Sequence, residues 1–140
     1  MTIRLATSDS DLRAAYPVMR QLRPSLEEEA FVAQARRQLQ TQPWRLALLE
    51  HEGRVVACAG FRVGEWLSWG RALYVDDLVT DELERSKGHG DALFDWLVAT
   101  ARAEGCETLH LDSGVQRFAA HRFYLRKRMS ITAHHFAMKL

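Results

Sequence analysis

The chain has 140 residues, a formal net charge of +1 and 47% hydrophobic residues. This length suits one domain over residues 1–140 with a substantial core. The near-neutral charge gives no sign of a basic surface that would bind nucleic acid, and no apolar run is long enough to span a membrane. Asp9 and Asp11 stand where a signal peptide would need its apolar centre, which favours a cytoplasmic protein.

A short strand over residues 2–6 and two helices are predicted at the N-terminus. Pro17 lies inside the helical pattern of the first helix, which must therefore start late or kink. Ser25 and Glu28 have capping-box spacing, so Ser25 is the expected N-cap of a second helix that runs toward Gln40.

Two strand-like runs follow, at residues 44–50 and 54–64, joined by a tight turn that contains a glycine. Residues 65–70 are predicted to form a short link to the next strand. Trp66 and Trp69 in this link either line a substrate pocket or cover an edge of the core.

The central stretch is predicted to be a strand over residues 73–80, a loop, and a helix that ends near Ala103. The first N–H groups of a helix have no internal partner, and the helix dipole adds partial positive charge there. Glycines let a bulky anion approach the backbone, and basic side chains add full charges. We therefore interpret the loop as a pyrophosphate cradle, made of Arg85, Ser86, Lys87, Gly88, His89, Gly90 and Asp91.

Other interpretations of this loop stay open. A solvated turn before a helix would have the same composition. The P-loop pattern is absent. Gly88 and Gly90 supply two glycines of a dinucleotide fingerprint, but Leu93 occupies the third position. Asp112 lies about 20 residues on, as that fingerprint requires, which keeps a nicotinamide dinucleotide binder in view.

The last part of the chain is predicted to be a strand over 107–112, a helix over 115–127 and a final strand over 131–140. Hairpin strands followed by alternating strands and helices indicate an α+β domain around one mixed sheet, with a parallel pair across the central helix. Cys58 and Cys106 have no metal or redox spacing and are expected to be reduced core thiols. The histidines have no ligand spacing, so no metal is expected.

Two blocks of the sequence resemble the GNAT family of N-acetyltransferases. The first is Arg-x-x-Gly-x-Gly after a strand, at Arg85, Gly88 and Gly90. The second is Ala-His-Arg-Phe-Tyr-Leu-Arg-Lys at residues 120–127, which is similar to the family's A-x-x-F-Y-x-x-x-G-F helix end.

The second block departs from the family at two positions. Arg117 replaces an Asn that contacts the cofactor in the family, and Arg128-Met129 replaces Gly-Phe. The second departure predicts a different exit from the helix, because Arg adopts a left-handed cap less readily than Gly.

The resemblance implies a GNAT-like domain with a mostly antiparallel sheet, splayed at the cofactor site, and helices on both faces. It implies acetyl-CoA as co-substrate, with the pyrophosphate on the cradle and a further contact from Arg117. The pantetheine arm would pair as a pseudo-strand with Leu78, Val79 and Thr80.

The chemistry of acetyl transfer assigns roles to three more residues. Tyr124 matches the family's Tyr and is a plausible general acid for the leaving thiolate; a core aromatic is the alternative. Asp76 and Asp77 resemble the Glu-Asp pair of polyamine acetyltransferases and are candidates for the base. Neighbouring strand residues point to opposite faces, so we expect only one of them to serve; a paired structural role is the alternative.

The sequence therefore predicts an N-acetyltransferase that acts on a primary amine of a small molecule or peptide. Neither nucleic acid nor membrane is an expected partner, and a homodimer is left open. The rival is a non-catalytic domain of the same fold that binds CoA as a regulatory ligand, which the departures at Arg117 and Arg128 favour.

Overall fold

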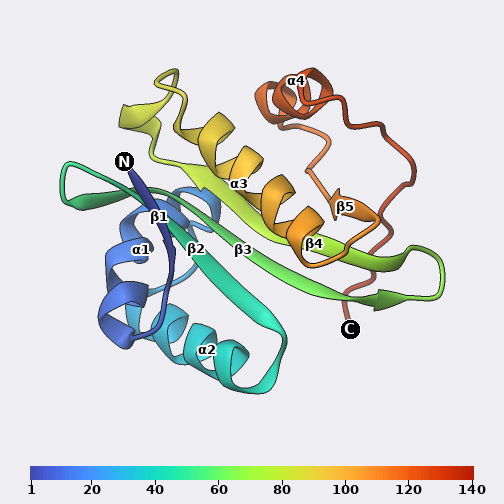
Figure 1. The fold of residues 1–140 in the computed structure, drawn as a ribbon. Helices are drawn as coiled ribbons and strands as arrows, with labels where there is room; N and C mark the ends of the chain where they lie inside the picture. The colour runs from blue at the N-terminus through green and yellow to red at the C-terminus, as the bar shows by residue number, and fades with distance from the viewer. The chain divides into compact units, whose positions relative to one another are not determined.

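The computed structural model describes residues 1–140 and divides into two compact units, Met1–His110 and Leu111–Leu140. None of its helices combines the length and apolar composition that crossing a bilayer requires. That the whole chain acts as one domain stays a prediction. Figure 1 shows the elements along the chain: β1 (Thr2–Leu5), α1 (Asp9–Leu22), α2 (Glu28–Thr41), β2 (Trp44–His51), β3 (Arg54–Trp66), β4 (Gly70–Thr80), the 3₁₀ turn η1 (Glu82–Glu84), α3 (His89–Ala103), β5 (Thr108–Leu111) and α4 (Phe118–Arg126).

The five strands form one sheet in the order β1-β2-β3-β4-β5. Neighbours from β1 to β4 are antiparallel, and β5 is parallel to β4, so the predicted α+β class with a mixed sheet is confirmed. β5 has four residues and begins where the Glu107 N–H donates to the Arg71 carbonyl, 2.8 Å away. It therefore runs beside the first half of β4 and leaves Leu78–Thr80 paired with β3 alone.

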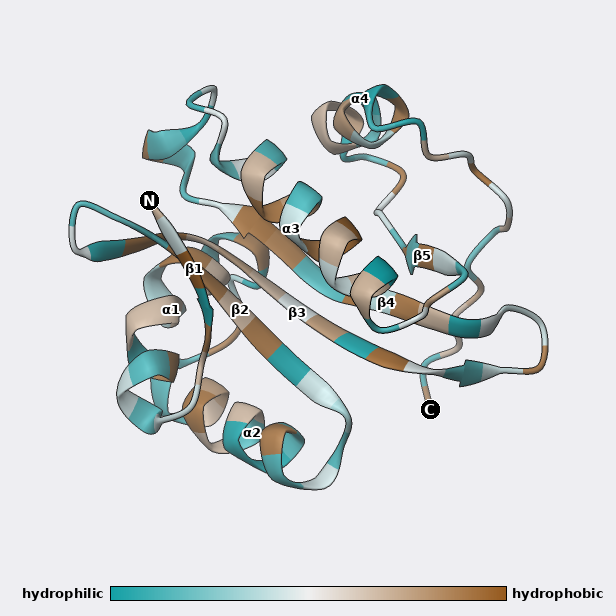
Figure 2. Cartoon of the chain, in the orientation of Figure 1, coloured by the Kyte–Doolittle hydropathy of each residue, from teal (hydrophilic) through white to brown (hydrophobic).

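Helices α1 and α2 pack on one face of the sheet. Ser8 caps α1 by accepting the Asp11 N–H, and the helix runs through Pro17 without ending there. Apolar residues at helical spacing on both helices meet alternate residues of β2 and β3, which makes the main core. Figure 2 shows apolar residues concentrated along these strands. The cluster includes Leu12, Ala15, Val18, Phe31, Val32, Leu46, Leu48 and Cys58.

The prediction that Ser25 caps the second helix is wrong, because α2 has Glu27 as its N-cap. The Tyr16 hydroxyl donates to the Leu26 carbonyl at 2.7 Å, and the Leu26 N–H donates to the Arg23 carbonyl at 3.1 Å. These bonds close a turn between α1 and α2, so the helix begins two residues later than the capping box predicted.

Helix α3 covers the opposite face of the sheet. Its buried side chains are Leu93, Phe94, Leu97 and Ala101, and Trp96 meets the Phe61 ring edge-on at 5.9 Å. Cys58 is fully buried while Cys106 is half-buried, and both are free thiols. Burial raises the pKa of Cys58, so this thiol stays protonated.

The sequence predicted the β2–β3 turn correctly but not the extent of the β3–β4 turn. The turn between β2 and β3 has positive φ at Glu52 and Gly53, as a type I′ hairpin requires, which confirms the predicted tight turn. The link predicted over 65–70 is wrong in extent. β3 continues to Trp66, which pairs with Gly70, so only three residues make the turn.

In the second unit, α4 begins later than predicted and ends in a Schellman motif. The Met129 N–H donates to the Tyr124 carbonyl at 3.1 Å, and the Arg128 N–H donates to the Leu125 carbonyl at 3.0 Å. Arg128 has φ +66°, which is the left-handed conformation that Gly usually supplies. The prediction of a different helix exit is therefore wrong: the exit is kept, with Arg in a strained position.

The predicted final strand over 131–140 is also wrong, because no strand forms there. Its apolar alternation is real, but Ile131, Phe136, Met138 and Leu140 are all exposed. A strand needs a neighbour for its N–H and C=O groups, and a side-chain pattern does not supply one.

The strain at Arg128 gives a stability prediction. Arg128→Gly should raise the free energy of unfolding by about 1 kcal/mol, since a left-handed L-residue costs about 1–2 kcal/mol and Gly recovers part of this. Lys127→Gly is the matched control: its φ is −76°, so glycine there should lower stability. Chemical denaturation of both variants measures the difference. Equal decreases in the free energy of unfolding would contradict backbone strain at Arg128.

Candidate active site

Strand β4 carries a β-bulge at its centre. Gly60 of β3 pairs with Asp77 and Phe61 pairs with Val75, so Asp76 is an extra residue with no partner on β3. A bulge interrupts the alternation of side chains along a strand. The prediction that Asp76 and Asp77 point to opposite faces is therefore wrong, as the contacts of their carboxylates demonstrate.

The Asp76 carboxylate is fully engaged by Arg62. The Arg62 Nε and Nη2 donate to its two oxygens at 3.1 and 2.5 Å, a bidentate ion pair. Arg62 Nη1 also donates to the amide oxygen of Gln42, the residue that follows α2, at 3.1 Å. This closed arrangement on the α1–α2 side gives Asp76 a structural role.

The Asp77 carboxylate faces the same side but is held from one oxygen only. Arg23, at the C-terminal end of α1, donates to Oδ1 from Nε at 2.8 Å, and its Nη2 forms an ion pair with the same oxygen at 2.8 Å. Burial raises the pKa of Asp77, the Arg23 pair opposes this, and the nearby Asp76 charge adds to the increase. A mostly buried carboxylate with a raised pKa has the properties of a general base.

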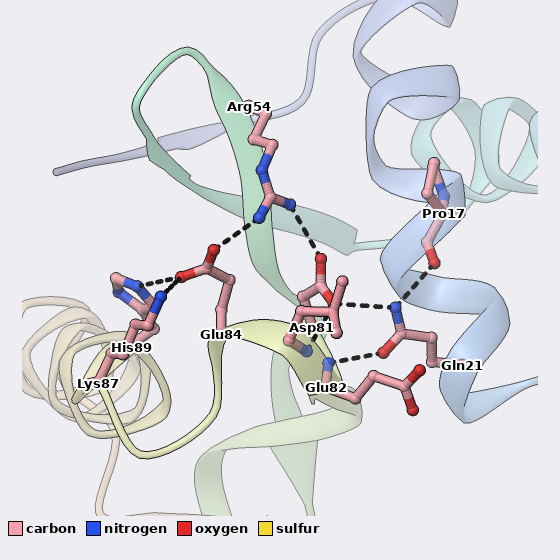
Figure 3. Close-up of polar contacts among 9 residues, drawn as sticks. Pro17, Gln21, Arg54, Asp81, Glu82, Glu84, Lys87 and His89 are labelled. Carbon is pink, nitrogen blue, oxygen red and sulfur yellow. Dashed lines mark hydrogen bonds and ion pairs between the residues drawn. The ribbon is translucent and has the colours of Figure 1, made fainter.

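The loop after β4 is held by an ion-pair network (Figure 3). Arg54 of β3 donates to Asp81 at 2.9 Å and to Glu84 at 2.6 Å. Lys87 donates to Glu84 at 2.9 Å, and Gln21 of α1 donates to Asp81 at 3.3 Å. The network ties the loop to two elements of the core.

Both carboxylates of this network stay ionised. The hydrogen bond from Lys87 is the largest cause that lowers the pKa of Glu84. Burial pushes the pKa of Asp81 upward, but hydrogen bonds from the Leu83 N–H, Arg54 and Gln21 together leave it below its usual value.

His89 is the one predicted cradle residue whose side chain turns into the core. Its ring is buried, makes no hydrogen bond, and lies 5.2 Å from the His51 ring. Its Nε2 is 3.6 Å from Glu84, which is too long for a hydrogen bond. His89 therefore contributes its backbone N–H, and not its ring, to the surface of the loop.

The start of α3 has the backbone geometry of the predicted pyrophosphate cradle, whose binding role stays a prediction. Gly88 is the N-cap with φ +85°, a conformation suited to glycine, and no side chain caps the helix. The first intrahelical bond to the N-cap comes from the Ala92 N–H, so the N–H groups of His89 and Gly90 precede the first intrahelical acceptor. Arg85 is exposed at this loop, whereas the charge of Lys87 is engaged by Glu84.

The second unit places Tyr124 on α4 beside Arg117, the N-cap residue of that helix. Burial raises the pKa of Tyr124, and a hydrogen bond from the Arg117 side chain opposes this increase. The phenol is therefore protonated near neutral pH, and its oxygen accepts from a cation. A cofactor contact for Arg117 stays a prediction.

The aromatic residues of the β3–β4 hairpin form a cluster of their own. Trp69 stacks on the His110 ring at 3.6 Å, and its ring is parallel to that of Tyr74 and tilted against that of Trp66. Burial lowers the pKa of His110, so this imidazole favours its neutral form. The tryptophans thus pack against each other and against neighbouring rings at this hairpin, and both predicted roles stay predictions.

Sequence reasoning missed Arg23, Arg54, Arg62 and Glu84, because each acts through a partner distant in sequence. Arg62 could have been paired with Asp76 only if the bulge were known. Asp81 had a local signal: its side chain accepts the Leu83 N–H two residues on, a common turn and cap pattern.

Comparison with known proteins identifies the family. The profile of the acetyltransferase (GNAT) family matches residues 10–129. This chain belongs to that family. It is 34% identical over 121 residues to an uncharacterized N-acetyltransferase, YhdJ, of Bacillus subtilis (strain 168), covering 86% of this chain and 85% of that protein. The chain is accordingly an acetyl-CoA-dependent N-acetyltransferase.

Solved structures agree with this fold. A putative acetyltransferase from Agrobacterium tumefaciens str. C58 superposes with a TM-score of 0.86, at 21% identity and with full coverage of both chains. An aminoglycoside N-acetyltransferase in complex with CoA superposes with a TM-score of 0.85 at 13% identity, covering 99% of this chain and 93% of that one. The predicted sheet and its surrounding helices are thereby confirmed.

Proposed function

We propose that this chain transfers the acetyl group of acetyl-CoA to the primary amine of a small molecule or peptide. The observation that carries the proposal is the α3 start, which no side chain caps, one loop after a β4 segment that has β3 on one side only. The N–H groups from Ser86 to Asp91 would hold the pyrophosphate. The free edge at Leu78, Val79 and Thr80 would pair with the amide-bearing pantetheine arm.

Acetyl transfer needs two proton transfers. The amine nitrogen forms a bond to the acetyl carbon, the carbon–sulfur bond breaks, the amine loses a proton and the thiolate gains one. Asp77 would accept the proton from the amine, because its carboxylate is mostly buried and has a raised pKa. Tyr124 would donate a proton to the thiolate, and Arg117 would stabilise the resulting phenolate.

The direct test is release of CoA from acetyl-CoA with a panel of amines: an aminoglycoside, a polyamine, amino acids and a peptide. Product formation with at least one class supports the proposal. CoA binding without turnover on any amine would favour the regulatory domain instead. NADH binding that CoA does not displace would favour the dinucleotide binder.

The cofactor prediction separates two basic residues of the loop. Arg85→Gln should weaken CoA binding by about 10-fold or more, because hydrogen bonds to charged groups contribute about 1.5–3 kcal/mol. Lys87→Gln should lose less, since Glu84 already engages that ammonium group. Calorimetry on the two variants makes the comparison, and the reverse order would assign the phosphate contact to Lys87.

The base prediction separates the two carboxylates. If Asp77 is the base, kcat should fall as the pH drops through its pKa, which lies above the ordinary value of 3.8. Asp77→Asn should remove this acidic limb and most of the activity. Asp76→Asn should keep the limb, because the Asp76 carboxylate is tied to Arg62. Identical pH–rate profiles for both variants would leave the two carboxylates structural.

The acid prediction concerns the Tyr124 hydroxyl. Tyr124→Phe keeps the ring, so kcat should fall by about 10²–10⁴-fold while CoA affinity changes little. Tyr16→Phe is the control: its hydroxyl donates to the Leu26 carbonyl, so stability should fall and kcat should not. Steady-state rates and melting curves decide between the roles, and wild-type kcat in Tyr124→Phe would make Tyr124 a packing residue.

A further inference from the structure

The charges at the β4 bulge cancel in pairs. Arg62 neutralises Asp76, and Arg23 neutralises Asp77. A cleft built from two unpaired carboxylates would attract a polycation such as a polyamine. Here each carboxylate already has a guanidinium partner, so the bulge offers no net negative charge for that purpose.

In the Arg62–Asp76 pair, both carboxylate oxygens accept hydrogen bonds from Arg62. In the Arg23–Asp77 pair, one carboxylate oxygen and one guanidinium nitrogen have no partner. The Arg23 Nε donates to Asp77 Oδ1, and its Nη2 lies 2.8 Å from the same oxygen while it donates to the Asp76 carbonyl at 3.3 Å. Asp77 Oδ2 accepts no hydrogen bond and is not among the buried unpaired atoms, so it reaches solvent. Arg23 Nη1 has no partner, and the Arg23 side chain is 49% exposed.

We propose, on the basis of the acetyl transfer proposed above, that the acceptor is a small zwitterionic amine whose carboxylate or phosphate group binds Arg23 beside Asp77. The ammonium group faces Asp77 Oδ2, which accepts its proton. The anionic group faces the free Nη1 edge of Arg23, a donor arrangement that matches carboxylate and phosphate oxygens. A free negative oxygen next to a free cationic edge is complementary to a molecule that carries both charges.

Arg23 is held firmly enough to select a ligand. Its backbone N–H donates to the Met19 carbonyl in the last turn of α1. The Arg23 carbonyl accepts the Leu26 N–H at 3.1 Å in the turn that follows. Because backbone and guanidinium are both fixed, Arg23 loses little freedom when it binds an anion.

The experiment compares amines that differ only in the anionic group. One matched pair is O-phosphoethanolamine and ethanolamine, and the other is β-alanine and β-alaninamide. Each is tested with wild type, Arg23→Gln and the control Arg20→Gln, which removes an exposed charge in the same helix turn. The readouts are kcat/KM and, independently of turnover, calorimetric binding of both anionic amines to the CoA-bound enzyme.

In the wild type, at least one anionic amine should exceed its neutral partner by about 10-fold or more in kcat/KM, as a hydrogen bond between charged groups allows. Arg23→Gln should remove most of this preference and the corresponding binding, while Arg20→Gln should keep both. The pair that responds distinguishes carboxylate from phosphate.

Three results would overturn the proposal of a zwitterionic acceptor while leaving acetyl transfer in place. They are equal activity on the neutral amines, a preference for polyamines, and equal losses of activity on both members of a pair in Arg23→Gln. Arg23-dependent binding of an anionic amine without turnover on any amine would support the binding site and overturn the acetyl transfer.

Discussion

Strand β4 has one residue more than β3 at the point where Gly60 faces Asp77 and Phe61 faces Val75, and the candidate site depends on this bulge. In a regular strand, Asp76 and Asp77 would lie on opposite faces, and one of them would enter the apolar packing against α3. The bulge turns both carboxylates toward α1 and α2, where Arg62 and Arg23 meet them. The backbone irregularity thus determines which charges can pair.

Electrostatic pairing also fixes the loop that leads into α3. Asp81 and Glu84 are almost buried, with side chains 11% and 13% exposed, and Arg54 connects them. Removing Arg54 would leave two mostly buried carboxylates short of a partner, which is costly. The network therefore ties η1 and the residues that lead into α3 to β3.

The sequence predicted those features of the fold that depend on residues close together in the chain. The β2–β3 turn, the strand–loop–helix around Gly88 and the α+β class follow from glycine positions and periodicity. The parallel pair followed from the alternation of strands and helices, and the family resemblance added the cofactor and the roles of the site residues. Long-range features were out of reach: the bulge at Asp76 depends on strand register, and the pairing of Arg54 with Glu84 joins two distant parts of the sequence. The segment over 131–140 has the pattern of a strand but no neighbour to pair with.

The two adjacent carboxylates illustrate how geometry separates residues that sequence treats alike. Asp76 and Asp77 have similar exposure, 21% and 19%, so burial alone does not assign their roles. The two carboxylates differ in how many of their oxygens accept a hydrogen bond: Arg62 donates to both oxygens of Asp76, and Arg23 donates to one oxygen of Asp77. A bidentate pair leaves no strong acceptor site for an incoming ammonium group, whereas a one-sided pair keeps an oxygen available. If acetyl transfer uses a carboxylate at this bulge, as proposed above, Asp77 is the one that keeps an oxygen available, and Arg23 is the guanidinium group beside it.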